Sequence, residues 1–268
     1  MKTRKRKWVI YLGVLLTLII IVLFSANSII KGIVEKEIAS QLNNNPNNIY
    51  QITYSKLGIN VYTGSISIRD LRIQPADSIR KELSDAHIKK LLSAEIKVFK
   101  IKHINLYQFL KNSKVEISSI IIKNMLVDYY FKPGPNEATN KKTFVLQNIF
   151  SDKFRGAKIN TIDISNTTLR FSNASSINEP IFEIDSVGVL INDIELNKET
   201  LEHSIPIAFS DIKISTGHFS LNSSEYYTIK TEGIYFNYQD SSFVINGFAL
   251  LPNYSKQEYN KKIKYNDD

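Results

Sequence analysis

Short runs of alternating apolar and polar residues fill most of the chain after Ile49, and they constrain its fold more than any other feature. The runs are rich in Ile, Val, Tyr, Phe and Thr, which favour strands, and they repeat with a period of two. Examples are EIKVFKIKHI at 95–104, VEISSIII at 115–122 and DIKIS at 211–215. The sequence therefore predicts a mainly β fold built from antiparallel strands.

Helical patterns interrupt these runs in only two places. The segments 77–93 and 105–112 have helical spacing, and residues 132–142 are rich in turn formers and predict a loop. The sequence thus predicts a few short helices within a β-rich region that spans residues 49–268.

One apolar pattern of five positions occurs three times, with offsets of 42 and then 50 residues. The copies are Ile117, Ile120, Ile122, Val127 and Tyr129; Ile159, Ile162, Ile164, Leu169 and Phe171; and Phe209, Ile212, Ile214, Phe219 and Leu221. A two-residue turn in the middle of each copy pairs the flanking apolar residues across an antiparallel hairpin. The turns fall at Asn124 and Met125, at Asn166 and Thr167, and at Thr216 and Gly217. We therefore expect three hairpins with one apolar face each, and a looser fourth with Asp70 at its turn.

The N-terminus carries an uncharged stretch of 19 residues, from Trp8 to Ala26. As a helix it spans roughly 28 Å, which matches the hydrocarbon core of a bilayer. Five basic residues lie within positions 1–7 and place that tip in the cytoplasm by the positive-inside rule. We expect an uncleaved single-pass transmembrane helix over 8–26, with Trp8, Tyr11, Leu15, Ile19 and Leu23 in the membrane anchor.

A cleaved signal peptide is the alternative reading of this segment, because Ala26 and Ser28 are small enough to flank a cleavage site. The apolar stretch is longer than the usual core of a signal peptide, which favours the anchor. Residues 27–48 follow as an amphipathic helix and an Asn-rich linker. Everything after the anchor is then expected outside the cytoplasm.

The composition excludes several classes of function. The net charge is +8, but five of these charges belong to the N-terminal tip, and the remaining 29 basic and 26 acidic residues give only +3, so we expect no nucleic-acid partner. Cysteine is absent and the four histidines are isolated from one another, so no metal site is indicated. Nucleotide-binding and hydrolase motifs are also absent. We expect no enzymatic activity and no cofactor.

The order of these features resembles the N-terminal region of the AsmA-like family, the AsmA and TamB type of inner-membrane-anchored periplasmic proteins of Gram-negative bacteria. Three parts of the sequence carry the resemblance over roughly residues 1–250. They are the basic tip with its anchor, the segment KGIVEKEIASQL leading to YSKLGINVYTGSISIRDLRI, and the recurrence of VEISSIIIKNMLVDYYF as AKINTIDISNTTLRFS.

The resemblance implies a sheet curled into a hydrophobic groove, a location in the bacterial inner membrane with the bulk of the chain in the periplasm, and phospholipid as the partner. It implies a role in phospholipid transport or outer-membrane biogenesis. Family members are commonly longer, so the chain is either a fragment truncated at its C-terminus or a short member. The residues expected to line the groove are Ile120, Ile122, Val127, Ile162, Ile164, Leu169, Phe171, Ile212, Ile214 and Phe219.

A second arrangement satisfies the same apolar pattern. The apolar faces can pack on one another as the core of a β-sandwich, because an apolar sheet face must be covered by another sheet, a helix or a ligand. The protein is then a membrane-anchored binding or envelope-assembly module without lipid transport.

Overall fold

A computed structural model describes residues 50–76, 90–131, 154–173, 180–200, 207–222, 224, 226–255 and 257–259, together with the single positions 32 and 36. The predicted cytoplasmic tip, the transmembrane helix with its anchor residues, and nearly all of the predicted amphipathic segment 27–48 lie outside the described residues. Among the residues that are described, no helix is long and apolar enough to cross a membrane.

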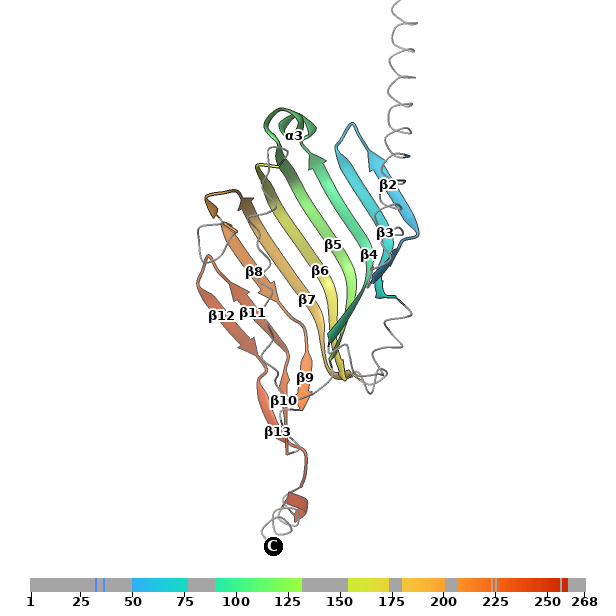
Figure 1. Cartoon of the computed structure of the whole chain (residues 1–268). Coiled ribbons are helices and arrows are strands. Elements are labelled where there is room, and N and C mark those ends of the chain that lie inside the picture. The colour runs from blue at the N-terminus through green and yellow to red at the C-terminus, as the bar shows by residue number, and fades with distance from the viewer. Residues whose placement is uncertain are drawn as a thin grey trace, which may run out of the picture.

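The described chain is mainly β and forms one large sheet that is partly curled (Figure 1). A single described helix of more than one turn, α3, covers Leu106–Asn112 between β4 and β5. The strands are β1 (Tyr50–Thr53), β2 (Lys56–Asn60), β3 (Ser65–Pro75), β4 (Lys90–Ile104), β5 (Lys114–Phe131), β6 (Gly156–Asn173), β7 (Pro180–Leu196), β8 (Asp211–Ser215), β9 (Phe219–Asn222), β10 (Tyr227–Thr231), β11 (Gly233–Asn237), β12 (Ser242–Asn246) and β13 (Ala249–Pro252). The mainly β prediction is confirmed.

The sheet is mixed, so the prediction of a wholly antiparallel sheet is wrong. Strands β5 and β6 pair in parallel, and the other pairs are antiparallel. Parallel neighbours need a long connection, and 24 residues separate Phe131 from Gly156. The sequence stretch that predicts a loop at 132–142 belongs to this connection and lies outside the described residues.

Thirteen strands make up only nine positions across the sheet, because eight of them are the halves of interrupted strands. β1 and β2 both pair with β3, and β8 and β9 both pair with β7. β11 then pairs with β8 and β12, while β10 pairs with β9 and β13. Five long strands, β3 to β7, run uninterrupted through the middle of the sheet.

The predicted hairpins do not form, because the residues on the two sides of each expected turn occupy one strand position of the sheet. β5 and β6 are continuous strands of 18 residues, and the expected turn positions Asn124 and Asn166 are left-handed residues within them, with φ of 54°. β3 is likewise continuous through Asp70, whose φ is 49°. The third expected hairpin consists of β8 and β9, which both pair with β7. A left-handed residue turns two consecutive side chains to one face, and this mimics the pattern of a turn.

The offset of 42 residues has a structural cause, since it is the register of the parallel pair. Ile120 lies beside Ile162, Ile122 beside Ile164, and Tyr129 beside Phe171. The recurrence in sequence is therefore a row-by-row match between neighbouring strands.

All nine strand positions are irregular along one line across the sheet, which we call the bend line. The residues on it are Ser55, Asp70, Lys97, Asn124, Asn166, Ser186, Gly217, Glu232 and Gly247. Several interactions between neighbouring strands hold it. The Ser55 hydroxyl donates to Asp70 Oδ2 at 2.8 Å, Lys97 Nζ lies 3.4 Å from Asp70 Oδ1, and Asn166 Nδ2 donates to Asn124 Oδ1 at 3.3 Å.

The helix expected over 105–112 is confirmed as α3. The Asn105 side chain caps it by accepting a hydrogen bond from the Gln108 backbone N–H at 3.1 Å, and Ser113 ends it with φ of 54°. The helix expected over 77–93 is wrong at its end, where residues 90–93 form the start of β4. Cross-strand pairing with β5 outweighs the helical spacing there, and residues 77–89 lie outside the described part.

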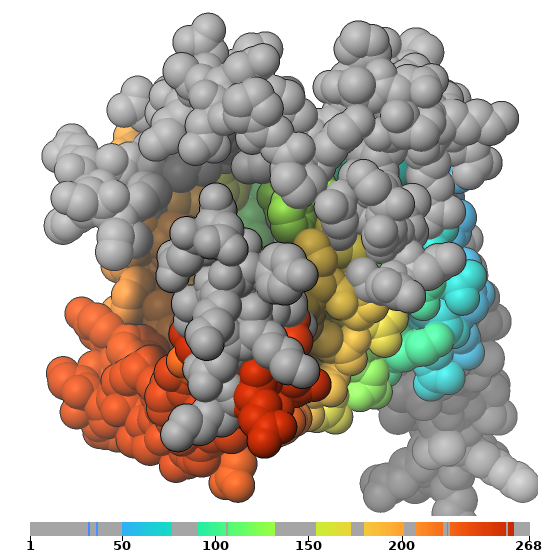
Figure 2. All heavy atoms as spheres, turned by 90° about the horizontal axis from the view of Figure 1, so that it is seen from below, coloured from blue at the N-terminus to red at the C-terminus, as the bar shows by residue number. Residues whose placement is uncertain are grey.

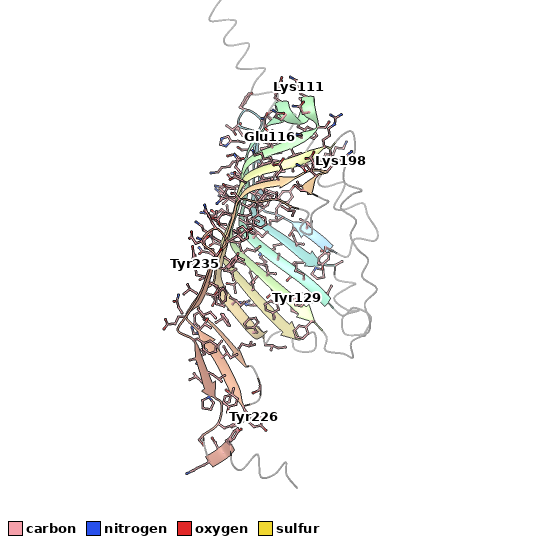
Figure 3. The ribbon with its side chains drawn as sticks, turned by 90° about the vertical axis from the view of Figure 1, so that its left-hand side faces the viewer. Lys111, Glu116, Tyr129, Lys198, Tyr226 and Tyr235 are labelled. Atoms are coloured by element: carbon pink, nitrogen blue, oxygen red, sulfur yellow. The ribbon has the colours of Figure 1, made fainter. Side chains whose placement is uncertain are left out.

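The curled sheet has an inner face toward its hollow and an outer face. Figure 2 shows the strands surrounding the hollow, and Figure 3 shows Tyr129 on the inner side and Tyr235 on the opposite side. Fully buried apolar residues are few in the described chain: Leu57, Leu91, Ala94, Ile96, Val187 and Ile194. The described sheet thus lacks the thick central core that two packed layers produce.

Candidate binding surface

The inner face carries apolar side chains in rows that cross the strands. One row consists of seven isoleucines on seven successive strand positions, paired in register from β2 to β8. We call it the isoleucine row: Ile59, Ile66, Ile101, Ile120, Ile162, Ile191 and Ile212. Because register partners on neighbouring strands point to the same side, this row is one continuous branched aliphatic surface.

A second row is longer and lies beside the bend line. This nine-strand row reaches every strand position of the sheet: Leu57, Ile68, Phe99, Ile122, Ile164, Val189, Ile214, Phe236 and Phe243. At a strand spacing of about 4.8 Å, its eight steps extend roughly 38 Å along the curve.

Beyond the bend line the surface turns aromatic. The aromatic row is Leu92, Tyr129, Phe171, Phe182, Leu221, Ile229 and Leu250. The Phe171 ring centroid lies 5.8 Å from that of Tyr129 and 5.2 Å from that of Phe182, and Phe182 is 5.8 Å from Phe219. Such distances are those of favourable aromatic pairs, so these rings stabilise the part of the sheet beyond the bend line.

The bend line keeps all these rows on one face. Successive inner-face residues are three positions apart at the bend, as from Ile122 to Met125 and from Ile164 to Thr167, whereas they are two positions apart in a regular strand. The left-handed residue lets two consecutive side chains face outward, so Lys123 and Asn124 are both exposed. A second irregular line at His103 and Asp193, with φ of 54° and 51°, does the same between Ile101 and Ile104 and between Ile191 and Ile194.

The structure places all ten predicted lining residues at paired positions of this face. Ile120, Ile162 and Ile212 belong to the isoleucine row; Ile122, Ile164 and Ile214 to the nine-strand row; Val127, Leu169 and Phe219 to a row completed by Ile184; and Phe171 to the aromatic row. Prediction missed the contribution of β7, which supplies Ile191, Val189, Ile184 and Phe182 between the copies of the pattern. A signal was present in the VGVLI run at 187–191.

Much of the surface is accessible, especially toward the C-terminal edge. The exposed fraction is 37% for Ile214, 63% for Phe243 and 54% for Leu250. The largest apolar side chains of β12 and β13 are therefore in contact with solvent, although a soluble sheet normally protects such an edge with charges.

The outer face is more polar than the inner face, although it also carries apolar residues such as Ile121, Leu126 and Leu190, and several ion pairs form on it. Arg170 Nε lies 2.8 Å from Glu183 Oε2, and Arg72 Nε lies 3.5 Å from Glu95 Oε1. The hydrogen bond from Arg170 to Glu183 raises the pKa of the guanidinium, while partial burial raises the pKa of Asp128, with nearby Arg170 opposing the shift. The hydrogen bond from Ser55 and the neighbouring Lys97 lower the pKa of Asp70.

No constellation for chemistry or metal binding occurs in the described part of the chain. No group of three or more His, Cys, Asp or Glu side chains is placed there to hold a metal ion. His103 lies near the end of β4 and His218 lies between β8 and β9; both are exposed, and the other two histidines fall outside the described residues. Asp185 accepts a hydrogen bond from the Thr168 hydroxyl at 3.0 Å, which accounts for it structurally.

Comparisons with protein-family models and with curated proteins find no match for this chain.

Proposed function

We propose that the inner face is a groove that binds and shields lipid acyl chains, in an inner-membrane-anchored periplasmic protein that acts in phospholipid transport or outer-membrane biogenesis. The observation that carries the proposal is the unbroken pair of aliphatic rows, the isoleucine row and the nine-strand row, on the accessible concave side of one sheet. The sequence resemblance to the AsmA-like family and the uncharged stretch at 8–26 support the same role.

The free energy of lipid transfer explains why such a surface is useful. Moving an acyl chain of ~15 methylenes through water costs on the order of 12 kcal/mol at ~0.8 kcal/mol for each methylene. A continuous aliphatic surface replaces water along the path. Branched isoleucines suit this task because they present a wide apolar surface and no hydrogen-bonding group.

The alternative, a closed β-sandwich, receives less support. A sandwich buries its apolar faces between two sheets, but the described strands all belong to one sheet, and the interior residues of its apolar rows are mostly only half-buried. A half-buried aliphatic face is better explained by reversible binding of a lipid than by permanent packing against a second sheet.

The test is native mass spectrometry with lipid extraction on the full chain, purified from a bacterial envelope in a mild detergent. We expect stoichiometric phospholipid on the unmodified chain. The double variant Ile164→Asp and Ile214→Asp places two carboxylates in the nine-strand row and should lower bound lipid at least about tenfold, since an unpaired charge among acyl chains costs more than 1.4 kcal/mol.

The matched control is Ser165→Asp with Ser215→Asp, which adds the same charges one residue further along the same strands, on the outer face. This variant should retain its lipid. Circular dichroism establishes that both variants fold. A lipid-free, monodisperse unmodified chain would refute the proposal, as would equal loss of lipid from the two folded variants.

A further inference from the structure

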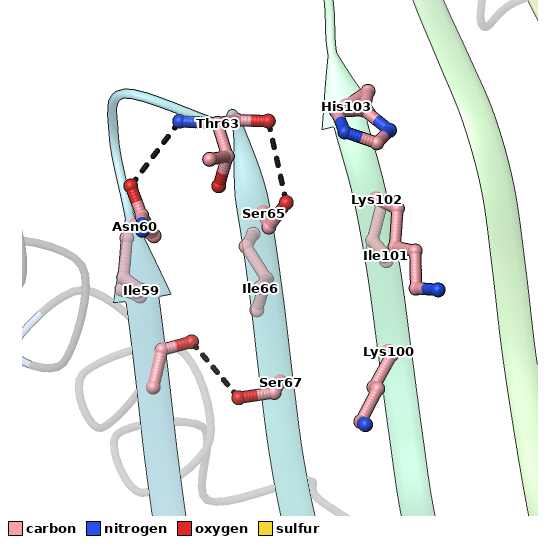
Figure 4. A pocket seen from close by; sticks show the side chains of 11 residues that line it. Ile59, Asn60, Thr63, Ser65, Ile66, Ser67, Lys100, Ile101, Lys102 and His103 are labelled. Atoms are coloured by element: carbon pink, nitrogen blue, oxygen red, sulfur yellow. Dashed lines mark hydrogen bonds between the residues drawn. The ribbon is translucent and has the colours of Figure 1, made fainter.

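A pocket of about 550 Å³ lies at the end of the sheet where β2, β3 and β4 run side by side (Figure 4). Two cross-strand rows of the outer face contribute most of its lining. Gly58 is paired with Ser67 and Ser67 with Lys100, while Asn60 is paired with Ser65, near Lys102. These residues alternate along their strands with Ile59, Ile66 and Ile101, so their side chains face away from the isoleucine row, although the same three isoleucines also contribute to the lining.

The floor of the pocket depends on a glycine and two hydroxyls. A Cβ atom at position 58 would lie 2.7 Å from Ser67 Oγ, so any larger residue would displace the Ser67 hydroxyl and fill part of the floor. The Ser67 hydroxyl lies 3.5 Å from the Gly58 carbonyl oxygen, and the Ser65 hydroxyl donates to the Thr63 carbonyl oxygen at 3.2 Å. Small hydroxyl side chains beside a glycine let a ligand approach the backbone closely.

The walls of the pocket are cationic and unneutralised. Lys100 and Lys102 are exposed, and neither forms an ion pair with any described residue. In the adjacent row of the same face Lys56 lies directly opposite Arg69, a like-charge pair that sheets normally avoid. The described lining includes no Asp or Glu, and the nearby Asp70 is already bonded to Ser55 and Lys97.

This charge is specific to one end of the outer face. On β6 and β7 the same face carries Asp163, Glu183 and Asp185, and Arg170 there is paired with Glu183. The cations around the pocket are therefore a local feature, and an anion bound among them would relieve their mutual repulsion.

We propose that this pocket binds a phosphate group, either in the headgroup of an anionic lipid or in a soluble phosphate ester. Lys100 and Lys102 form charge-assisted hydrogen bonds to the phosphate oxygens. The hydroxyls of Ser65 and Ser67 turn from the Thr63 and Gly58 carbonyl oxygens and donate to the phosphate from the floor, and Lys56 and Arg69 add longer-range attraction. The site lies on the face opposite the acyl-binding groove, so it does not depend on the function proposed above.

The test measures binding to the full chain in a non-ionic detergent at low salt, by thermophoresis. The probes are glycerol 1-phosphate, dioctanoyl phosphatidylglycerol and dioctanoyl phosphatidylcholine. The variant Lys100→Gln with Lys102→Gln should weaken binding of glycerol 1-phosphate about thirtyfold, at roughly 1 kcal/mol for each lysine. The control Lys198→Gln with Lys230→Gln removes two exposed charges elsewhere and should change it less than twofold.

The two sources of phosphate give different results. Equal affinity for glycerol 1-phosphate and for the anionic lipid identifies a soluble ester as sufficient, whereas much tighter lipid binding that is still lost in the Lys100 and Lys102 variant identifies the headgroup. Absence of phosphate binding to the unmodified chain, or equal effects of the two double variants, overturns the proposal. The phosphatidylcholine probe with Ile164→Asp reports on the groove separately, because that substitution leaves the pocket intact.

Discussion

The two halves of the sheet cross the same bend line in different ways. The long strands β3 and β5 to β7 pass through it on a single left-handed residue, namely Asp70, Asn124, Asn166 or Ser186. The C-terminal strands are interrupted instead, at Gly217, Glu232 and Gly247, so that β8, β10 and β12 end there and β9, β11 and β13 begin; of these three residues Gly247 is also left-handed, with φ of 58°. Both devices keep apolar residues on the inner face.

The difference shows that every strand position keeps the bend, whereas the backbone conformation that produces it differs between the two halves. A left-handed Asn or Asp costs little strain and preserves the ladder on both sides. An interruption still keeps single backbone hydrogen bonds, such as that from Gly217 N–H to the Asp185 carbonyl oxygen, and it accompanies the more exposed half, where the exposed fraction of Phe248 is 61%. The long-strand half should therefore be the more stable and the less tolerant of change.

Deleting Asn166 should have the largest effect. The deletion removes the left-handed step, so the residues after it, including Leu169 and Phe171, turn to the outer face or slip out of register with β5. Exposure of these side chains should cost about 3 to 5 kcal/mol of unfolding free energy. Denaturant unfolding followed by circular dichroism measures it.

Deleting His218 is the matching change in the C-terminal half, within the stretch that connects β8 and β9. We expect a loss of no more than about 1 kcal/mol there, since the interruption can absorb the change. Equal losses for the two deletions would mean that the two devices are equally constrained.

Substituting the left-handed residues tests the backbone itself. Asn124→Val and Asn166→Val place a β-branched side chain at a φ of 54° and should each cost about 1 to 3 kcal/mol in unfolding free energy. Asn124→Gly and Asn166→Gly keep that conformation accessible and should cost clearly less than the valine variants, with the remaining loss due to the hydrogen bond between the two Asn side chains. If valine and glycine behave alike in the same denaturation assay, the positive φ is not what these positions require.

The strand content and the apolar face follow from the sequence, but the topology does not. Period-two runs identify most strands, and the five-position pattern selects residues that lie on one face, such as Ile122, Ile164 and Ile214. The same three-residue step fits a two-residue turn and a left-handed residue inside a strand, and the local sequence around Asn124 and Asn166 suits both. Only pairing between distant strands distinguishes them.

Strand β7 shows the second limit of prediction. Its residues Asp185, Gly188 and Asp193 interrupt the alternation, although the strand is the one that joins the two halves of the sheet. The outer pocket was also not predictable, because Gly58, Ser67 and Lys100 become neighbours only through the register of three strands. A cation cluster assembled by register leaves no local motif.

Aromatic packing should distinguish the two halves at a smaller scale. Phe171→Ala removes ring contacts to Tyr129 and Phe182 and should cost about 1 to 3 kcal/mol in unfolding free energy, less than for a fully buried ring. Phe243→Ala truncates a side chain that is 63% exposed and should cost less than about 0.5 kcal/mol. Thermal melts of both variants provide the measurement, and a larger loss for Phe243 would place unseen packing on the C-terminal edge.

The smallest expected effect is the pH dependence of the bend line at Asp70. Its pKa is lowered in the folded chain by the Ser55 hydroxyl and Lys97, so its stabilising contribution is present above the ordinary Asp pKa of about 3.9 and is lost as the pH falls through the lower folded value. Asp70→Asn keeps the left-handed conformation and removes the charge. The stability difference between the unmodified chain and this variant should be constant from about pH 7 to pH 5 and disappear at more acidic pH.

Asp128 should show a pH dependence of the opposite sign, because burial raises its pKa in the folded chain. Asp128→Asn should therefore gain stability relative to the unmodified chain as the pH rises through the unfolded and folded pKa values of Asp128. Parallel pH profiles for the two variants would show that the local contacts at Asp70 do not set its titration.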